Sequence, residues 1–75
     1  MSAYGHVLFY TSAAAFRAEG LVKRLPLPLP GARLVPTPRE LSSDCGVALR
    51  FALDDRSSIQ SLLDDAKVPY DRIEG

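Results

Sequence analysis

The residue best suited to chemistry is Cys45, the only cysteine in this 75-residue chain. It lies in the segment 36–46, which is polar, contains two prolines and ends in glycine, so we expect an exposed loop. One thiol cannot form a disulfide within the chain, and it cannot complete a structural zinc site by itself. Three roles stay open: a reactive or carrier thiol, an intermolecular disulfide, and a small buried apolar side chain.

The residues around Cys45 would decide how reactive it is. Gly46 places no side chain beside the sulfur, and Ser42 and Ser43 can bend the loop through hydrogen bonds to its backbone. Arg39 is a candidate for stabilising a thiolate or another anion. These features favour a thiol that a second macromolecule approaches over one at the bottom of a deep pocket.

Other kinds of site have little support. His6 is the only histidine and no nucleophile-elbow motif is present, which argues against a Ser-His-Asp hydrolase. One cysteine and one histidine are too few soft ligands for a metal site, although two chains could share copper or zinc across a dimer. There is no glycine-rich phosphate loop. We therefore expect no cofactor and no metal.

Composition narrows the function classes further. Nine basic and nine acidic residues balance, so we expect no nucleic acid and no anionic membrane as partner. No apolar run approaches the ~20 residues of a membrane span. Residues 6–15 imitate a signal peptide, but no Lys or Arg precedes them, and we expect a cytoplasmic protein. The core of a single domain over 1–75 would be marginal, so association into a homo-oligomer would add stability.

Hydrophobic periodicity gives the elements that must position the loop. Alternating or continuous apolar runs predict strands, and the i, i+3, i+4 spacing predicts helices, with Thr11 or Ser12 capping the first and Asp54 the second. The expected strands are 6–10, 32–35, 46–53 and 70–73, and the expected helices are 13–25 and the stretch from Asp54 to Val68. This order is the α+β, ferredoxin-like βαββαβ plan: a two-layer sandwich with an antiparallel four-stranded sheet.

The first and third strands should be central in this plan, and the proline-bearing second strand and the fourth should be edges. We further expect the first and third strands to run parallel, so that their starts lie together. This would make His6 a neighbour of Cys45, where a protonated imidazole would stabilise the thiolate. The chain termini and the last turns of both helices would lie at the same end, where the helix dipoles would not activate the thiol.

Two stretches of this sequence resemble a known family. They are Tyr10-Thr11-Ser12 followed by Ala18-Glu19, and the block LVPTPRELSSDCGVALRF over 34–51. The chain is similar to the DUF3343 family, described as putative selenium/sulfur carrier protein-like. The Leu-Pro repeat over 25–30 departs from that family's pattern and leaves the local geometry of this connection open.

The resemblance implies that Cys45 is a carrier thiol, with Pro36, Pro38, Arg39, Ser42, Ser43 and Gly46 shaping its loop. The chain would then relay sulfur or selenium, as a persulfide or selenosulfide, from a donor protein to an acceptor protein, and would be a carrier more than an enzyme. One alternative is a small non-catalytic interaction or regulatory subunit in which the cysteine is structural. Another is a redox sensor that dimerises through Cys45 on oxidation.

Overall fold

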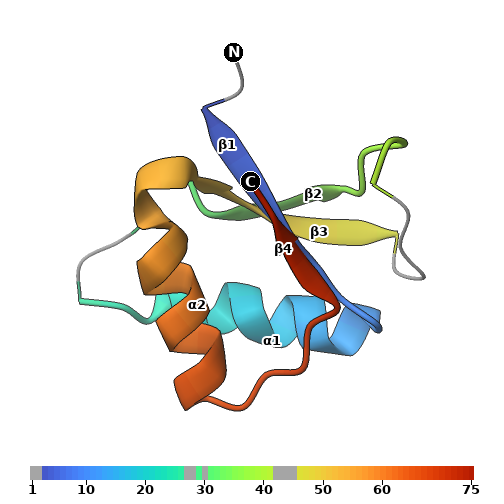
Figure 1. Cartoon of the computed structure of the whole chain (residues 1–75). Coiled ribbons are helices and arrows are strands. Elements are labelled where there is room, and N and C mark those ends of the chain that lie inside the picture. Colours follow the sequence, from blue (N-terminus) through green and yellow to red (C-terminus); the bar gives the residue numbers. More distant parts are fainter. Residues whose placement is uncertain (1–2, 27–28, 30, 42–45) are drawn as a thin grey trace.

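The computed structural model describes residues 3–26, 29, 31–41 and 46–75, and Figure 1 shows how they fold. Two helices lie against one side of a four-stranded sheet, so the α+β class is confirmed. In chain order the elements are β1 (Tyr4–Leu8), α1 (Ser12–Lys23), β2 (Arg33–Pro36), β3 (Val47–Ala52), a 3-10 turn (Leu53–Asp55), α2 (Arg56–Asp65) and β4 (Arg72–Glu74).

The sheet has the strand order β2-β3-β1-β4, and every neighbouring pair is antiparallel. The predicted positions of the strands are therefore right: β1 and β3 are central, and β2 and β4 are the edges. The architecture is consistent with the ferredoxin-like plan. Pro36 ends the edge strand β2, where its missing N–H removes no bond from the interior of the sheet.

The direction predicted for the central strands is wrong. β1 and β3 run antiparallel, with Tyr4 opposite Ala52 and Leu8 opposite Ala48. The start of β3 therefore lies beside the end of β1. The physical reason is the connection over 37–46, which is short enough for a hairpin and reverses the chain between β2 and β3.

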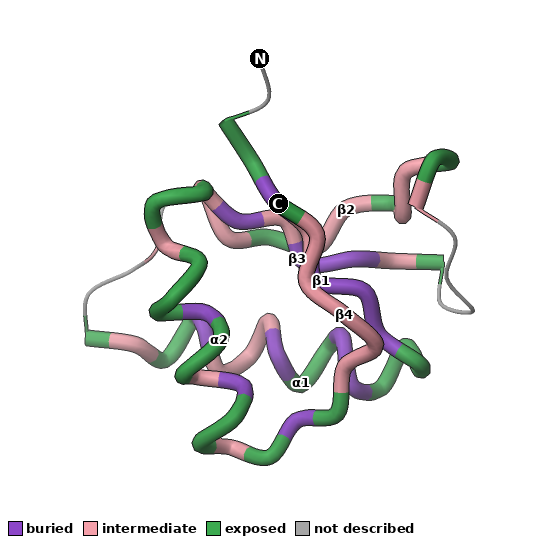
Figure 2. Tube along the Cα trace, viewed as in Figure 1, coloured by how far each residue is buried: buried purple, intermediate pink, exposed green. Residues whose placement is uncertain are grey.

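The hydrophobic core lies between the sheet and the helices, where buried positions of both layers face one another (Figure 2). Val7, Leu49 and Phe51 supply it from the central strands, and all three side chains are fully buried. Strand periodicity explains this choice, because alternate side chains of a strand point to the same face. The helices add Ala14, Ala15, Ala18, Val22, Ile59 and Leu63.

Both helices begin near the predicted residues. The Thr11 hydroxyl accepts a hydrogen bond from the N–H of Ala14 at 3.2 Å, which confirms Thr11 as the cap of α1. The prediction for α2 is wrong by one residue: Asp55, not Asp54, is at its N-cap, and no side chain caps it. A 3-10 turn occupies the residues between β3 and α2, so α2 begins later in the sequence than predicted.

No helix among the described residues combines the length and the apolar character that crossing a membrane requires.

Candidate functional site

The predicted loop is the connection of the β2–β3 hairpin. Pro36 pairs with Val47 at the end of the ladder, and the N–H of Thr37 then donates to the carbonyl of Gly46 at 3.1 Å. The loop between these two residues spans 38–45, so Cys45 is its last residue in sequence. Cys45, Ser42 and Ser43 themselves lie outside the described residues, and their roles stay predictions.

Arg39 lies in a turn at the start of this loop. The N–H of Leu41 donates to the carbonyl of Pro38 at 3.0 Å, which closes the turn around Arg39 and Glu40. The Arg39 side chain is exposed and forms no ion pair with a described residue. An arginine in this position can meet an incoming anion, and its role in stabilising a thiolate or another anion stays a prediction.

Gly46 is exposed and lies at the other end of the loop. A Cβ atom built on it would meet no described atom within 4 Å, apart from those of its chain neighbours. Packing of the described region therefore does not require glycine at this position. The role of Gly46 in leaving space beside Cys45 stays a prediction.

The argument that placed His6 beside Cys45 is wrong. His6 pairs with Arg50 on one side and with Glu74 on the other, in the middle of the sheet. Arg50 follows Gly46 by four residues, which is about 13 Å of strand at the usual rise per residue. The parallel arrangement that brought the two strand starts together does not exist.

The helix ends are also distributed differently from the prediction. α1 starts at Ser12, just after the end of β1, and this end of the sheet is where β3 starts. The hairpin loop and the first turn of α1 therefore belong to the same end of the molecule, with the last turn of α2. The Arg17 guanidinium links these two helix ends by donating to the Ala66 carbonyl at 3.1 Å. The partial positive charge of the α1 N-terminus favours anions at this end, and the partial negative charge of the α2 C-terminus opposes them.

Two aromatic side chains that the sequence pattern did not single out lie at the same end. Tyr10 follows β1 closely and is 56% exposed, and Phe16 in the second turn of α1 is 59% exposed. Single exposed apolar residues are common on protein surfaces, and Tyr4, at the other end of the sheet, is also exposed. For Tyr10 the signal was present in the sequence, as an aromatic residue at the end of an apolar run.

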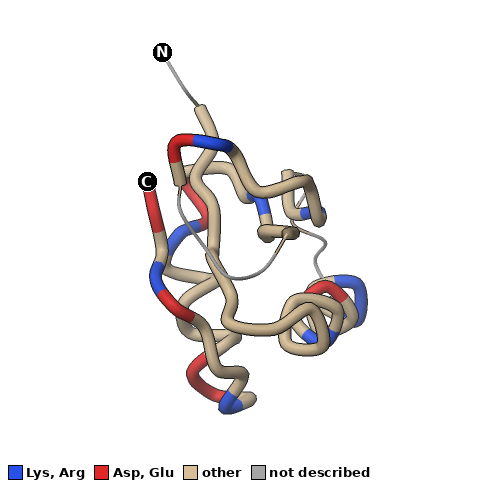
Figure 3. Tube along the Cα trace, turned by 90° about the vertical axis from the view of Figure 1, so that its right-hand side faces the viewer, with Lys and Arg blue, Asp and Glu red and all other residues tan. Residues whose placement is uncertain are grey.

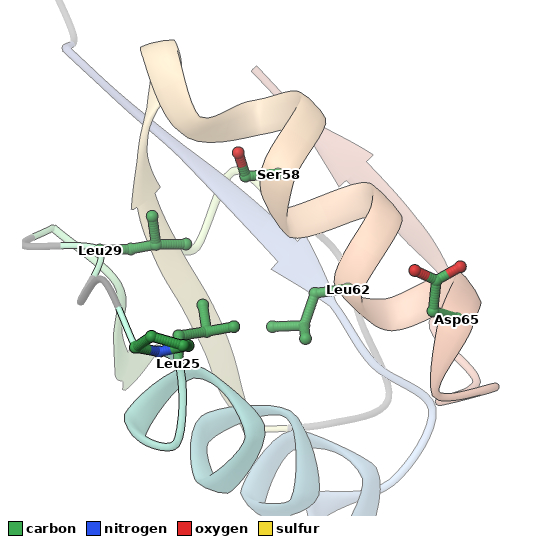
Figure 4. A pocket seen from close by; sticks show the side chains of 6 residues that line it. Leu25, Leu29, Ser58, Leu62 and Asp65 are labelled. Atoms are coloured by element: carbon green, nitrogen blue, oxygen red, sulfur yellow. The ribbon is translucent and has the colours of Figure 1, made fainter.

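An open, mostly apolar groove lies elsewhere, between the two helices and the connection that follows α1 (Figure 4). Its volume is about 470 Å³. Three leucines dominate its walls, and α2 contributes two polar side chains: it is lined by Leu25, Pro26, Leu29, Ser58, Leu62 and Asp65. Of the predicted site residues that the structure describes, His6, Arg39 and Gly46, none lines this groove. Figure 1 shows the hairpin on the other side of the molecule from the connection that follows α1.

Metal-ligating residues do not gather in the part of the chain that the structure describes. No group of three His, Cys, Asp or Glu side chains there has the arrangement needed to hold an ion. At the described end of the hairpin, the exposed Arg39 guanidinium is a group that can bind an anion.

Similarity to known proteins adds to this geometry. A family model described as "Putative Se/S carrier protein-like" matches residues 4–74. The chain belongs to this family. Searches of curated proteins and of solved structures found no match. The resemblance inferred from the block around Cys45 is thus confirmed over nearly the whole chain.

Proposed function

We propose that this member of the Se/S carrier family holds a sulfur or selenium atom on the thiol of Cys45 and passes it between proteins. The observation that carries the proposal is the family match over residues 4–74, taken with the presence of a single cysteine. A covalently held chalcogen needs a thiolate nucleophile, and this chain has one candidate. A lone thiol stays reduced in the cytoplasm, where we expect the protein to work.

The transfer is a thiol exchange in two steps. The Cys45 thiolate attacks the outer sulfur of a donor persulfide, a new sulfur–sulfur bond forms at Cys45, and the bond within the donor breaks to release the donor's thiolate. A thiolate of the acceptor then attacks the outer sulfur on Cys45 in the same way. No electrons are gained or lost overall, so the chain needs no redox cofactor. A selenium atom would follow the same route as a selenosulfide.

Local electrostatics support an anion at this end of the molecule. Arg39 is exposed in the same hairpin loop, and α1 starts at this end of the sheet. An arginine close to a thiolate or a persulfide anion lowers the energy of that anion, whereas the start of α1 and the end of α2 act in opposite directions. Ser42 and Ser43 are proposed to shape the loop.

Exposed aromatic residues support a protein partner at the same end. Tyr10 and Phe16 offer apolar area that a donor or acceptor protein would bury. If they form the docking surface, Tyr10→Ala slows transfer from a protein donor and leaves loading from a small polysulfide unchanged. If Tyr10→Ala slows loading equally from the protein donor and from the polysulfide, the substitution acts on the thiol or on folding and not on docking.

The decisive experiment is intact-mass spectrometry after incubation with a cysteine desulfurase and cysteine. We expect the mass of one sulfur atom to be added to the wild-type chain, to be removed by a reductant, and to be absent in Cys45→Ser. The absence of an adduct under conditions that load an established carrier would contradict the proposal. If the wild-type chain gains no adduct and Cys45→Ala still binds the partners of the wild type, the results instead indicate the interaction-subunit alternative.

A further inference from the structure

A row of basic side chains crosses the face of the sheet that the helices do not cover. Arg33 of β2 lies opposite Arg50 of β3, Arg50 lies opposite His6 of β1, and His6 lies opposite Glu74 of β4. Residues opposite one another share a face of the sheet. These positions alternate with the core residues Leu49 and Phe51, so the row is on the helix-free side.

Placing Arg33 directly opposite Arg50 is unfavourable in the isolated chain, because like charges opposite one another on a sheet repel. Neither guanidinium forms an ion pair with a described residue. The one carboxylate in the row, Glu74, is already paired with Arg72, whose Nε lies 2.6 Å from its Oε1. Two positive charges and an imidazole therefore stand side by side without a compensating anion in the described region.

Arg50 is held in position by an aromatic ring. Its guanidinium carbon lies 4.3 Å from the centre of the Tyr4 ring, a cation–π geometry that orients the group over the sheet. Its Nε atom is buried and makes no hydrogen bond to any residue that the structure describes. Leaving such a donor unsatisfied costs about 1–3 kcal/mol, so an acceptor that reached it would be favoured.

The size of the charged row limits what fits. From Arg33 to His6 it spans two strand spacings, or about 10 Å. The next row towards the hairpin contains Ala48 and Leu8, both fully buried, and Arg72 of β4, which is already paired with Asp71 and Glu74. Ala52 follows on the other side. Along the described part of the trace, acidic positions lie among the basic ones (Figure 3), so the row does not continue into a longer run of basic positions. These limits favour a small anion over a long polyanion.

We propose that this face binds a tetrahedral oxyanion of the phosphate class, carried on a small molecule, between Arg33 and Arg50. Guanidinium groups bind phosphate through paired charge-assisted hydrogen bonds, which would neutralise the repulsion and satisfy the buried donor together. The site does not use Cys45, and the inference does not depend on the carrier function.

The test uses inorganic phosphate and pyrophosphate, with sodium chloride at equal ionic strength as the reference. The melting temperature of the full chain is measured, and its backbone amide signals are followed by NMR. We expect both anions to raise the melting temperature above the chloride value and to shift the amides of Arg33, Arg50 and His6. Arg33→Gln should weaken binding at least ~10-fold, which is the loss of one charge-assisted interaction. Arg24→Gln, an exposed change at the end of α1, should leave binding as in the wild type.

A second variant works in the opposite direction. Arg33→Glu puts a carboxylate opposite Arg50, so it should raise the melting temperature without phosphate and abolish the response to phosphate. Cys45→Ala should bind as the wild type does, which separates this site from the carrier site. The proposal is overturned if phosphate acts no differently from chloride, or if Arg33→Gln binds normally. It is also overturned if a short polyglutamate peptide shifts the same amides at lower concentration than pyrophosphate, since that result indicates an acidic protein partner.

Discussion

Gly5 occupies a position in β1 where no side chain fits. A Cβ atom there would lie 2.5 Å from Cζ of Phe51 and 2.7 Å from the carbonyl oxygen of Glu74. The Phe51 ring therefore lies directly against the backbone of β1, and β4 closes the space from the other side. Glycine is needed here because the Phe51 ring and the Glu74 carbonyl approach the β1 backbone closely. The conformational freedom of glycine is not the reason.

We expect Gly5→Ala to destabilise the fold by about 1–3 kcal/mol, because the core must shift to admit one methyl group. Gly20→Ala is the matched control. Gly20 lies inside α1 with nothing within 4 Å of its Cβ position, so alanine should stabilise the helix by about 0.5–1 kcal/mol. Urea unfolding of both variants measures the difference. Equal stability of the two variants would show that Phe51 does not pack against Gly5.

Gly46 allows a test that separates folding from transfer. Alanine at this position meets no described atom, so Gly46→Ala should change the free energy of unfolding by less than about 0.5 kcal/mol. If the glycine leaves space for a partner thiol, the same variant should load sulfur several-fold more slowly than the wild type. Normal loading by a normally folded variant would remove Gly46 from the proposed site.

Candidate site residues could be selected from the sequence where the residue type alone marks them. Cys45 stands out because it is the only thiol, and Arg39 because it is a charge within the same loop. The requirement for glycine at position 5 could not be predicted, because it depends on the register that sets Gly5 opposite Phe51. Register also sets Arg33 opposite Arg50, two residues that are far apart in the sequence.

At the scale of elements, the order βαββαβ followed from hydrophobic periodicity, but the strand directions did not. The helix between β1 and β2 allows these two strands to run in the same direction, while the short 37–46 connection forces β3 to turn back. The length of that connection can be read from the sequence, and it is sufficient to place His6 away from the loop. The start of α2 was missed because a 3-10 turn absorbs Leu53–Asp55.

The connection between α2 and β4 contains a hydrogen bond that depends on pH. The Tyr70 hydroxyl donates to Oδ1 of Asp64 at 3.2 Å. Partial burial first, and then this hydrogen bond and the negative charge of Asp64, raise the pKa of Tyr70 above its ordinary value. The folded state therefore holds the phenol proton more tightly than the unfolded state does.

The raised pKa of Tyr70 makes the stability of the fold depend on pH. The contribution is fully present below the unfolded pKa of about 10, and it is lost as the pH rises through the higher folded pKa. Tyr70→Phe should cost less than about 1 kcal/mol at neutral pH, because the bond is exposed, and should flatten the loss of stability above pH ~10. Tyr10→Phe, at an exposed position, is the control. Identical alkaline unfolding curves for wild type and Tyr70→Phe would contradict the assignment.

At the scale of the whole molecule, different residues lie at the two ends of the sheet. The hairpin loop, the start of α1 and the exposed Tyr10 lie at one end. The N-terminal part of β1 lies at the other, where Tyr4 pairs with Ala52 and Ala3 accepts a hydrogen bond from Leu53. Figure 1 shows the start of β1 at a distance from the hairpin. The antiparallel pairing of β1 with β3 is what separates the two ends.

This separation gives a prediction about where a donor protein docks. A folded domain fused to the N-terminus would stand at the far end of the sheet, so it should leave the rate of sulfur loading within about twofold of the unfused chain. The rate is measured by intact-mass spectrometry with a protein donor and, in parallel, with a small polysulfide. Slower loading by the protein donor alone would mean that the donor contacts the end of the sheet near Tyr4, and the hairpin end would no longer be the docking surface. Unchanged loading by both donors would leave the hairpin end, with Arg39 and Tyr10, as the surface that the donor meets.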